Sequence, residues 1–295
     1  MAVGALWGAV YPLTTVVLRE LPTSALVAAR TGLAAVVLVP LAWRVGVLGS
    51  VAARPVAVVV AAGLQATVPL VLLTAGQRDV GAAVAGIVLA SQPVWAVVFT
   101  GVLDRRVEPV AVAGVVVGLV GVGLLFVGDG GGTGTTAVGG VVLVGAAACF
   151  AAGAVFIERV IPDMPPLGIA AAAMVVTTLA LVPFAVGAGA GWPTGGTLGW
   201  LVVLGVVATA GALVLFYRLI VDVGAVRANL AGYLAPGFAV VFGVVLLDES
   251  IGALDLLGLT LILAGTYLAS GSGVRAGARG SRSGVPGRWP GARRP

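Results

Sequence analysis

The sequence predicts an all-helical membrane protein with ten transmembrane helices. Three observations lead to this prediction. Hydrophobic residues make up 60% of the chain and charged residues only 9%, whereas a typical soluble domain has about 25% charged residues. The apolar residues also run in continuous stretches of about 20, the length that crosses a bilayer as a helix. Such spans leave short loops and a tail, so a soluble catalytic domain is excluded.

The apolar stretches occupy ten segments along the chain. In order they are residues 2–19, 24–43, 56–76, 80–102, 109–127, 138–161, 166–187, 198–220, 224–247 and 252–270. Continuous rather than alternating hydrophobicity favours helices over the strands of a membrane barrel. We expect the first segment to be retained and not cleaved as a signal peptide. It lacks a basic start and a cleavage site, and a second span follows almost at once.

The basic residues predict the orientation, with both termini in the cytoplasm. In that arrangement most of the 16 basic residues, all arginines, lie in cytoplasmic segments. The outside loops hold Arg19 and Arg78, and Arg30 falls within a span. This distribution follows the positive-inside rule. The Ala, Gly and Val bias and the absence of lysine indicate a GC-rich bacterial genome, and therefore the bacterial inner membrane.

The last 25 residues, 271–295, are rich in Gly, Arg, Ser and Pro and contain no acid. Such a composition predicts disorder. A role in binding anionic lipid is one interpretation, and a simple topology anchor is the favoured one. The net charge of +5 lies mainly in this tail and at helix ends, so nucleic acid is not an expected partner.

An internal repeat relates the two halves of the chain. Residues 79–99 read DVGAAVAGIVLASQPVWAVVF, and residues 222–242 read DVGAVRANLAGYLAPGFAVVF. The two segments are offset by 143 residues, so that Pro93 aligns with Pro236. Each copy holds five helices, an odd number, and the second copy must enter the membrane upside down. The predicted organisation is a first repeat at 1–127, a Gly-rich linker at 128–137, a second repeat at 138–270 and the tail.

Short motifs in both repeats resemble those of the EamA family in the drug/metabolite transporter superfamily. In the first repeat they are Leu6-Trp7-Gly8, residues 29–35 (ARTGLAA) and Gln92-Pro93; in the second they are Thr209, residues 217–220 (YRLI), Gly224-Ala225, Asn229, residues 233–236 (YLAP), Asp248-Glu249, Gly258 and residues 264–268 (AGTYL). The resemblance implies a ten-helix carrier of small metabolites, often an exporter, with helices 1, 3, 4, 6, 8 and 9 around a central cavity. The first repeat departs from the family in having Asp104-Arg105 where a Gly-Glu pair is expected.

Polar and proline residues at mid-membrane positions are the predicted site. Pro93 and Pro236 should kink their helices and free carbonyl groups, either to shape a site or only to adjust packing. The predicted substrate-binding residues are amides, hydroxyls and aromatic rings, namely Trp7, Tyr11, Gln65, Thr67, Gln92, Trp95, Asn229 and Tyr233. Hydrogen bonding between helices is the alternative role of the amides, and interfacial anchoring is the alternative for Trp7.

Two charged residues, Arg30 and Glu158, have separate predicted roles. Arg30, inside the second span, either attracts an anionic group of the substrate or has a structural role, by snorkelling or by bonding carbonyls of a neighbouring helix. The resemblance favours the structural role, because the family carries arginine here across many substrates. Glu158 is the one acid away from a predicted loop or helix end, and pairing with the adjacent Arg159 is its simplest role. Little machinery for proton coupling is therefore visible, which favours a facilitator or exchanger.

Glycines on the fifth span, Gly114, Gly118 and Gly121, predict close packing between helices, more within the fold than at a homodimer face. No metal, cofactor or nucleophile constellation is present in the sequence, so an enzyme is not expected. The predicted function is export of amino acids or related metabolites by alternating access. The alternatives are a carrier of drug-like or lipid-linked sugar substrates and a non-transporting subunit of a membrane complex.

Overall fold

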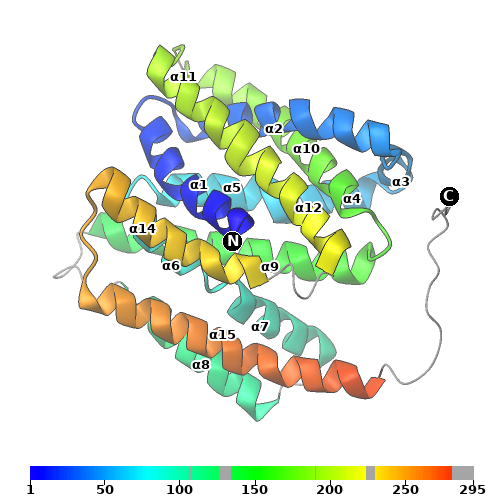
Figure 1. Ribbon diagram of the computed structural model, residues 1–295, viewed down its shortest axis with the longest axis vertical. Helices are drawn as coiled ribbons and strands as arrows, with labels where there is room; N and C mark the ends of the chain where they lie inside the picture. The colour runs from blue at the N-terminus through cyan, green and yellow to red at the C-terminus, as the bar shows by residue number, and fades with distance from the viewer. Residues whose placement is uncertain (106–107, 126–133, 190, 224–229, 281–295) are drawn as a thin grey trace.

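The computed structural model describes residues 1–105, 108–125, 134–189, 191–223 and 230–280, and this part of the chain is helical, with no β-strand. Six stretches are long and apolar enough to cross a membrane, and shorter apolar helices of 10–17 residues accompany them. The helices lie side by side in a bundle (Figure 1). The predicted all-helical class is therefore confirmed, and the composition of the helices is that of a multi-pass membrane protein.

The first half of the bundle begins with the helix at the very start of the chain. Its elements are α1 (Ala2–Leu18), α2 (Thr23–Val45), the short α3 (Leu48–Ala52), α4 (Pro55–Ala62), η1 (Gly63–Thr67), α5 (Val68–Gly76), α6 (Ala82–Leu89), α7 (Gln92–Asp104) and α8 (Pro109–Leu124). Two of the apolar stretches are composite, because α4, η1 and α5 form one and α6 and α7 form another. Prolines occupy the first turn of α4, α7 and α8, where the missing N–H costs nothing.

The second half repeats this pattern. Its elements are α9 (Gly134–Val160), α10 (Pro166–Gly187), α11 (Gly195–Val202), η2 (Val203–Gly211), α12 (Ala212–Val223), η3 (Leu230–Leu234), α14 (Ala235–Leu247) and α15 (Ala253–Gly280). Here α11, η2 and the start of α12 form one apolar stretch, Gly195–Phe216. The predicted last segment ended at residue 270, but α15 continues to Gly280, although four of the ten added residues are glycines, which are poor helix formers. Residues 281–295 lie outside the described residues.

The two aligned prolines lie at the start of a helix. Pro93 is in the first turn of α7, and the helix is interrupted at Ala90 and Ser91 between α6 and α7. Pro236 is in the first turn of α14, and the 3₁₀ turn η3 precedes it. Since proline cannot donate to the preceding turn, each one separates two short helical segments within an apolar stretch.

Two π-helical segments occupy matching positions. The segment η1 covers residues 63–67, and η2 covers residues 203–211, which include the positions 143 residues further on. In η1 the Val68 amide donates to the Gly63 carbonyl five residues earlier, and in η2 the Ala212 amide donates to Val207. Pro69 follows η1 and has no amide hydrogen, which favours the wider turn there. Segments of this kind are frequent at functional sites in helices.

Helices α8 and α15 cross through reciprocal glycine contacts and lie side by side at one edge of the bundle (Figure 1). A Cβ atom added to Gly121 would lie 2.7 Å from the Gly258 carbonyl oxygen, and one added to Gly258 would lie 2.8 Å from the Gly121 oxygen. Gly114 meets Gly265 in the same way, at 2.6 Å. The predicted glycine stripe therefore packs inside the chain and is not available to a second copy.

Helix pairs from opposite halves also form the rest of the core. Helix α2 packs along α10, with Leu38, Ala42, Ala171 and Met174 buried in one cluster. Helix α1 packs against α14 through small residues, since a Cβ on Gly8 would lie 2.9 Å from the Ala235 carbonyl oxygen. The interior is thus built mainly from contacts between the two halves.

Large apolar side chains cover much of the outer surface. Val36, Val141 and Leu179, on α2, α9 and α10, are 72%, 71% and 69% exposed. A soluble protein rarely exposes so continuous an apolar surface. Bilayer hydrocarbon is the solvent that matches it.

Hydrogen bonds and ion pairs join the two halves at both ends of the bundle. At the end where α1 leads into α2, Glu20 accepts hydrogen bonds from Thr194 and Thr197, which lie before and within α11. At the end where α2 leads into α4, Arg54 pairs with Asp163 at 3.5 Å. Arg159, at the end of α9, pairs with Asp104, at the end of α7, at 2.8 Å. Both ends are therefore closed by contacts between halves.

Glu249 caps a helix of the other half. Its carboxylate accepts hydrogen bonds from the amides of Ala82, at 2.7 Å, and Ala83, at 2.8 Å, in the first turn of α6. A carboxylate at this place satisfies free amides and complements the helix dipole. The contact links the loop between α14 and α15 to the start of the proline-interrupted stretch.

Glu20 predicts a pH-dependent stability. Hydrogen bonds from Thr197 and Thr194 hold the pKa of its carboxyl below the ordinary value. Because the folded-state pKa is the lower one, this stabilisation is complete above the unfolded value of about 4.3 and is lost as the pH falls through the folded value. The melting temperature of Glu20→Gln should therefore lie below that of the wild type at pH 7, with a gap that closes in acid. A gap that stays constant from pH 7 to pH 3 would contradict this role.

Candidate functional site

Trp7 and Tyr11 lie one turn apart on α1 and so share one face of that helix. The Trp7 ring contacts Phe216 of α12, with ring centroids 5.0 Å apart and planes tilted by 54°. The Tyr11 ring lies against Gly86 of α6, where an added Cβ would be 3.4 Å from the ring. Both rings are half-buried. This face of α1 therefore touches elements from both halves.

Gln77, directly after α5, forms a hydrogen bond to the backbone of α1 at Tyr11. Its amide Nε2 donates to the Tyr11 carbonyl oxygen at 3.0 Å and to Thr15 Oγ1 at 3.3 Å. The side chain is buried, and its Oε1 has no hydrogen-bond partner among the described residues. Gln77 was not among the predicted site residues, because it stands at the end of a span.

Arg30 is buried in α2 and reaches across to the other half. Its side chain is 5% exposed, which excludes snorkelling to the surface. Nε donates to Thr209 Oγ1 in η2 at 2.9 Å, and Thr209 in turn donates to the Leu204 carbonyl at 2.7 Å. The partner is thus a side chain in a π-helical segment and not a carbonyl. Nη1 has no hydrogen-bond partner among the described residues, and Tyr11 is the titratable group near its charge.

Threonine pairs join the two halves at the same level of the bundle. Thr67, the last residue of η1, lies 2.9 Å from Thr177 of α10, measured between the hydroxyl oxygens. Thr31 of α2 lies 2.9 Å from Thr178 of α10. Each π-helical segment is therefore hydrogen-bonded to a helix of the opposite half.

Gln65 lies in the middle of η1 and faces α9. A Cβ added to Gly153 would lie 2.6 Å from Gln65 Oε1, so only glycine allows this approach. The Oε1 atom is buried and has no hydrogen-bond partner in the described part of the chain. The Gln65 side chain therefore lies inside the bundle, and its oxygen accepts no hydrogen bond from the described residues.

The remaining predicted residues fall on the proline-interrupted stretches. Gln92 is the first residue of α7 and is half-buried. Trp95 lies one turn on, near Phe99, and its Nε1 is buried with no partner among the described residues. Tyr233 lies in η3 and is 38% exposed. Asn229 lies outside the described residues.

The expected pairing of Glu158 with Arg159 is wrong. Glu158 is exposed near the end of α9, and Arg159 forms its ion pair with Asp104 instead. Adjacent residues of a helix do not face each other, so a neighbour in sequence is a poor partner for an ion pair. The Asp104-Arg105 departure from the family motif thus has a structural consequence, since Asp104 fastens α7 to α9.

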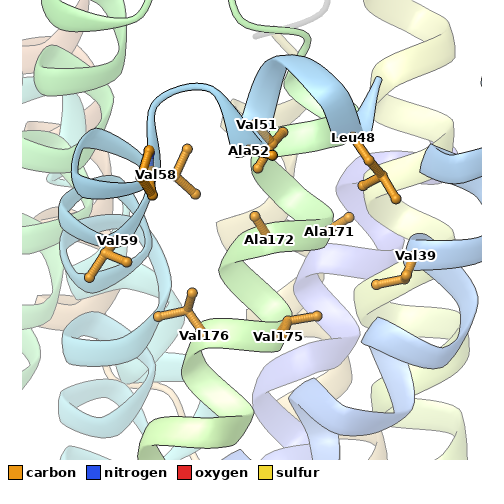
Figure 2. Close-up of a pocket in the computed structure, with 11 residues that line it drawn as sticks. Val39, Leu48, Val51, Ala52, Val58, Val59, Ala171, Ala172, Val175 and Val176 are labelled. Carbon is orange, nitrogen blue, oxygen red and sulfur yellow. The ribbon is translucent and has the colours of Figure 1, made fainter. Parts of the chain in front are cut away.

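Two pockets on the surface of the bundle contain none of the predicted site residues. The first, of about 320 Å³, lies among α2, α3, α4 and α10 and is lined by valine, leucine, alanine and proline side chains (Figure 2). The second, of about 610 Å³, lies between α2 and the η2–α12 stretch, with Arg44 as its one charged lining residue. Hydrocarbon fits such walls better than a polar solute does.

Several buried polar atoms have no hydrogen-bond partner among the described residues. They belong to Thr14, Arg30, Gln65, Thr74, Gln77 and Trp95. Three of these residues, Arg30, Gln65 and Trp95, were predicted from the sequence. Thr209 and Thr177 were missed, because a threonine in a helix usually bonds its own backbone.

Comparison with known proteins identifies the family. The model of the EamA-like transporter family matches the chain at residues 1–127 and again at residues 137–271. The chain belongs to the EamA-like transporter family. The predicted resemblance is confirmed, and membership in the EamA-like family makes this chain a multi-pass membrane transporter in its general class.

Structure comparison shows that a solved protein shares this fold. One crystal structure matches with a TM-score of 0.65 and 22% sequence identity, covering 91% of this chain and 94% of the other. Identity this low shows a shared fold alone. No curated protein sequence matches the chain.

Proposed function

We propose that this protein exports amino acids or related small metabolites across a bacterial inner membrane by alternating access. One observation carries the proposal beyond the family assignment. Three predicted site residues, Arg30, Gln65 and Trp95, keep buried polar atoms that the described protein does not satisfy. Such atoms are costly in a bundle surrounded by lipid. A polar substrate or water passing between the halves would satisfy them.

The proposed topology is ten spans, arranged as two inverted five-helix repeats with both termini in the cytoplasm. The paired π-helical segments and the two matches of the family model support the duplication. The reciprocal contacts Gly121–Gly258 and Gly114–Gly265 support a two-fold relation between the halves. The end of the bundle with Arg54 and Arg159 would face the cytoplasm, as the arginine distribution requires.

The proposed site lies where the two halves meet. Trp7, Tyr11 and Arg30 would form one wall, with the η2 segment behind them. Gln65, Thr67, Gln92 and Trp95 would form the other wall, and Tyr233 would complete it from the second proline-interrupted stretch. Asn229, which lies outside the described residues, is proposed for the same site from its place in the sequence. Breaks before Pro93 and Pro236 provide hinges at which each stretch bends. Rocking of the halves would expose this region to each side in turn.

A drug-like substrate is the second candidate, and the apolar pockets beside α2 favour it. A lipid-linked sugar belongs to the same alternative. A non-transporting subunit would use the unpaired polar atoms for a partner helix. An enzyme is not proposed, because the family to which the chain belongs is one of transporters.

The coupling proposed is facilitated diffusion or exchange. None of the acids in the described chain is buried, so a carboxylate that carries a proton through the middle is lacking there. A pH gradient across proteoliposomes should therefore change the final accumulation little.

A thermal-shift screen tests the proposal. A ligand that binds only the folded protein raises its melting temperature with concentration. We expect at least one compound from a panel of amino acids, nucleosides, sugars and drugs to stabilise the purified protein. Gln92→Ala combined with Asn229→Ala should weaken that stabilisation about tenfold or more in concentration. Unchanged binding by the double variant would remove these residues from the site, and a panel without any effect would favour the subunit alternative.

A further inference from the structure

Arg30 is the only charged side chain among the buried residues of the described chain. A guanidinium stays charged at physiological pH. A charge removed from water is costly unless an opposite charge and hydrogen bonds compensate it. The structure gives this cation one neutral partner, the Thr209 hydroxyl, and leaves Nη1 without a partner among the described residues.

No acid in the described chain supplies the missing charge. Its ion pairs are Arg54–Asp163 and Arg159–Asp104, both at the end of the bundle away from Glu20. Glu20 itself is exposed and its oxygens are occupied by Thr194 and Thr197. Arg30 lies seven residues into α2, about 10 Å from its start at 1.5 Å per residue. The charge is therefore uncompensated within the described part of the chain.

We infer that Arg30 binds the carboxylate of the transported substrate, which is a monocarboxylate or a zwitterion such as an amino acid. This inference rests on the proposed function. Thr209 accepts from Nε, and Nη1 remains for a carboxylate oxygen of the substrate. Tyr11 lies near the same charge, and Trp7, one turn away on α1, offers an aromatic wall to the rest of the substrate.

The charge balance selects a single carboxylate over a phosphate. One buried guanidinium neutralises one negative charge, whereas a phosphate monoester carries nearly two at neutral pH. The second negative charge would meet no other buried cation among the described residues, whereas the ammonium group of an amino acid can lie against the aromatic rings of Trp7 and Tyr11. A neutral sugar would leave the charge of Arg30 uncompensated both with and without bound substrate.

The test compares ligands that share a carbon skeleton. Alanine, leucine and phenylalanine are measured by thermal shift on the full-length protein, beside the amide, the decarboxylated amine and the deaminated acid of each. We expect at least one amino acid or deaminated acid to stabilise the wild type. Its amide and amine should need about ten to a hundred times higher concentration.

Variants separate binding from structure. Arg30→Met should melt no lower than the wild type without ligand, because it removes an uncompensated charge, and should lose the preference for the carboxylate. Arg44→Gln, at the exposed end of the same helix, is the matched control and should keep that preference. Equal stabilisation by acid and amide in the wild type would overturn the inference without using any variant. Binding of other compounds alone would overturn it while leaving the carrier proposal intact.

Discussion

Gly121→Leu is expected to lower the melting temperature by several degrees or to prevent folding. A Cβ at this position would lie 2.7 Å from the Gly258 carbonyl oxygen and 2.9 Å from the Ile262 amide nitrogen. Backbone atoms cannot move aside as a flexible side chain can, so α8 and α15 would have to separate. Overpacking of a core usually costs about 1–3 kcal/mol, and contact with backbone places this change at the upper end.

Gly123→Leu is the matched control for that prediction. Gly123 lies two residues further along α8, and an added Cβ there would have nothing within 4 Å. It should retain a melting temperature close to that of the wild type, measured by fluorescence of detergent-purified protein. Since leucine is a better helix former than glycine at both positions, equal loss of stability in both variants would show that the reciprocal crossing is not its cause.

A disulfide between positions 67 and 177 is expected to stop transport reversibly. The hydroxyls of Thr67 and Thr177 are 2.9 Å apart and belong to opposite halves. Sulfur atoms at these places need little adjustment to reach bonding distance of about 2.0 Å. The variant Thr67→Cys with Thr177→Cys is made in a Cys149→Ala background, because Cys149 is the chain's one cysteine. Oxidation should remove nearly all flux in cross-linked molecules, since rocking separates the halves.

Reduction of the same sample provides the internal control. Flux should return when the bond is broken, which separates the effect of the cross-link from that of the substitutions. The single variant Thr177→Cys, oxidised in parallel, should keep its flux. Full transport by completely cross-linked protein would show that the η1–α10 contact stays fixed during transport.

The helical fold could be predicted from the sequence because the apolar runs are long and continuous. The segment predicted at 166–187 coincides with α10, Pro166–Gly187, since a proline starts that helix and glycines follow it. The π-helical segments could not be predicted in this way. A wider turn leaves hydrophobicity and propensity unchanged, and only Pro69 and the repeat give a local indication of it.

The sequence indicated which polar residues are buried, but it did not indicate which residues they contact. A polar residue among apolar ones marks a buried position, and Arg30 and Gln65 were found by that criterion, whereas Trp95 was chosen as an aromatic cavity wall. Their partners depend on how distant helices pack. Thr209 is 179 residues from Arg30 along the chain, and no sequence spacing connects the two. The pairing of Arg159 with Asp104 was missed for the same reason, while its neighbour Glu158 was the obvious choice in sequence.

The most direct test of the carrier claim is counterflow by the purified protein in liposomes. Vesicles are loaded with an unlabelled compound that stabilises the protein, and a trace of the labelled compound is added outside. A carrier that exposes its site to each side in turn should concentrate the label inside transiently, in the absence of any ion gradient. The oxidised 67–177 cross-linked variant should not do so. Ligand binding without counterflow by the wild type would contradict the account and would favour a membrane subunit that binds its ligand without moving it.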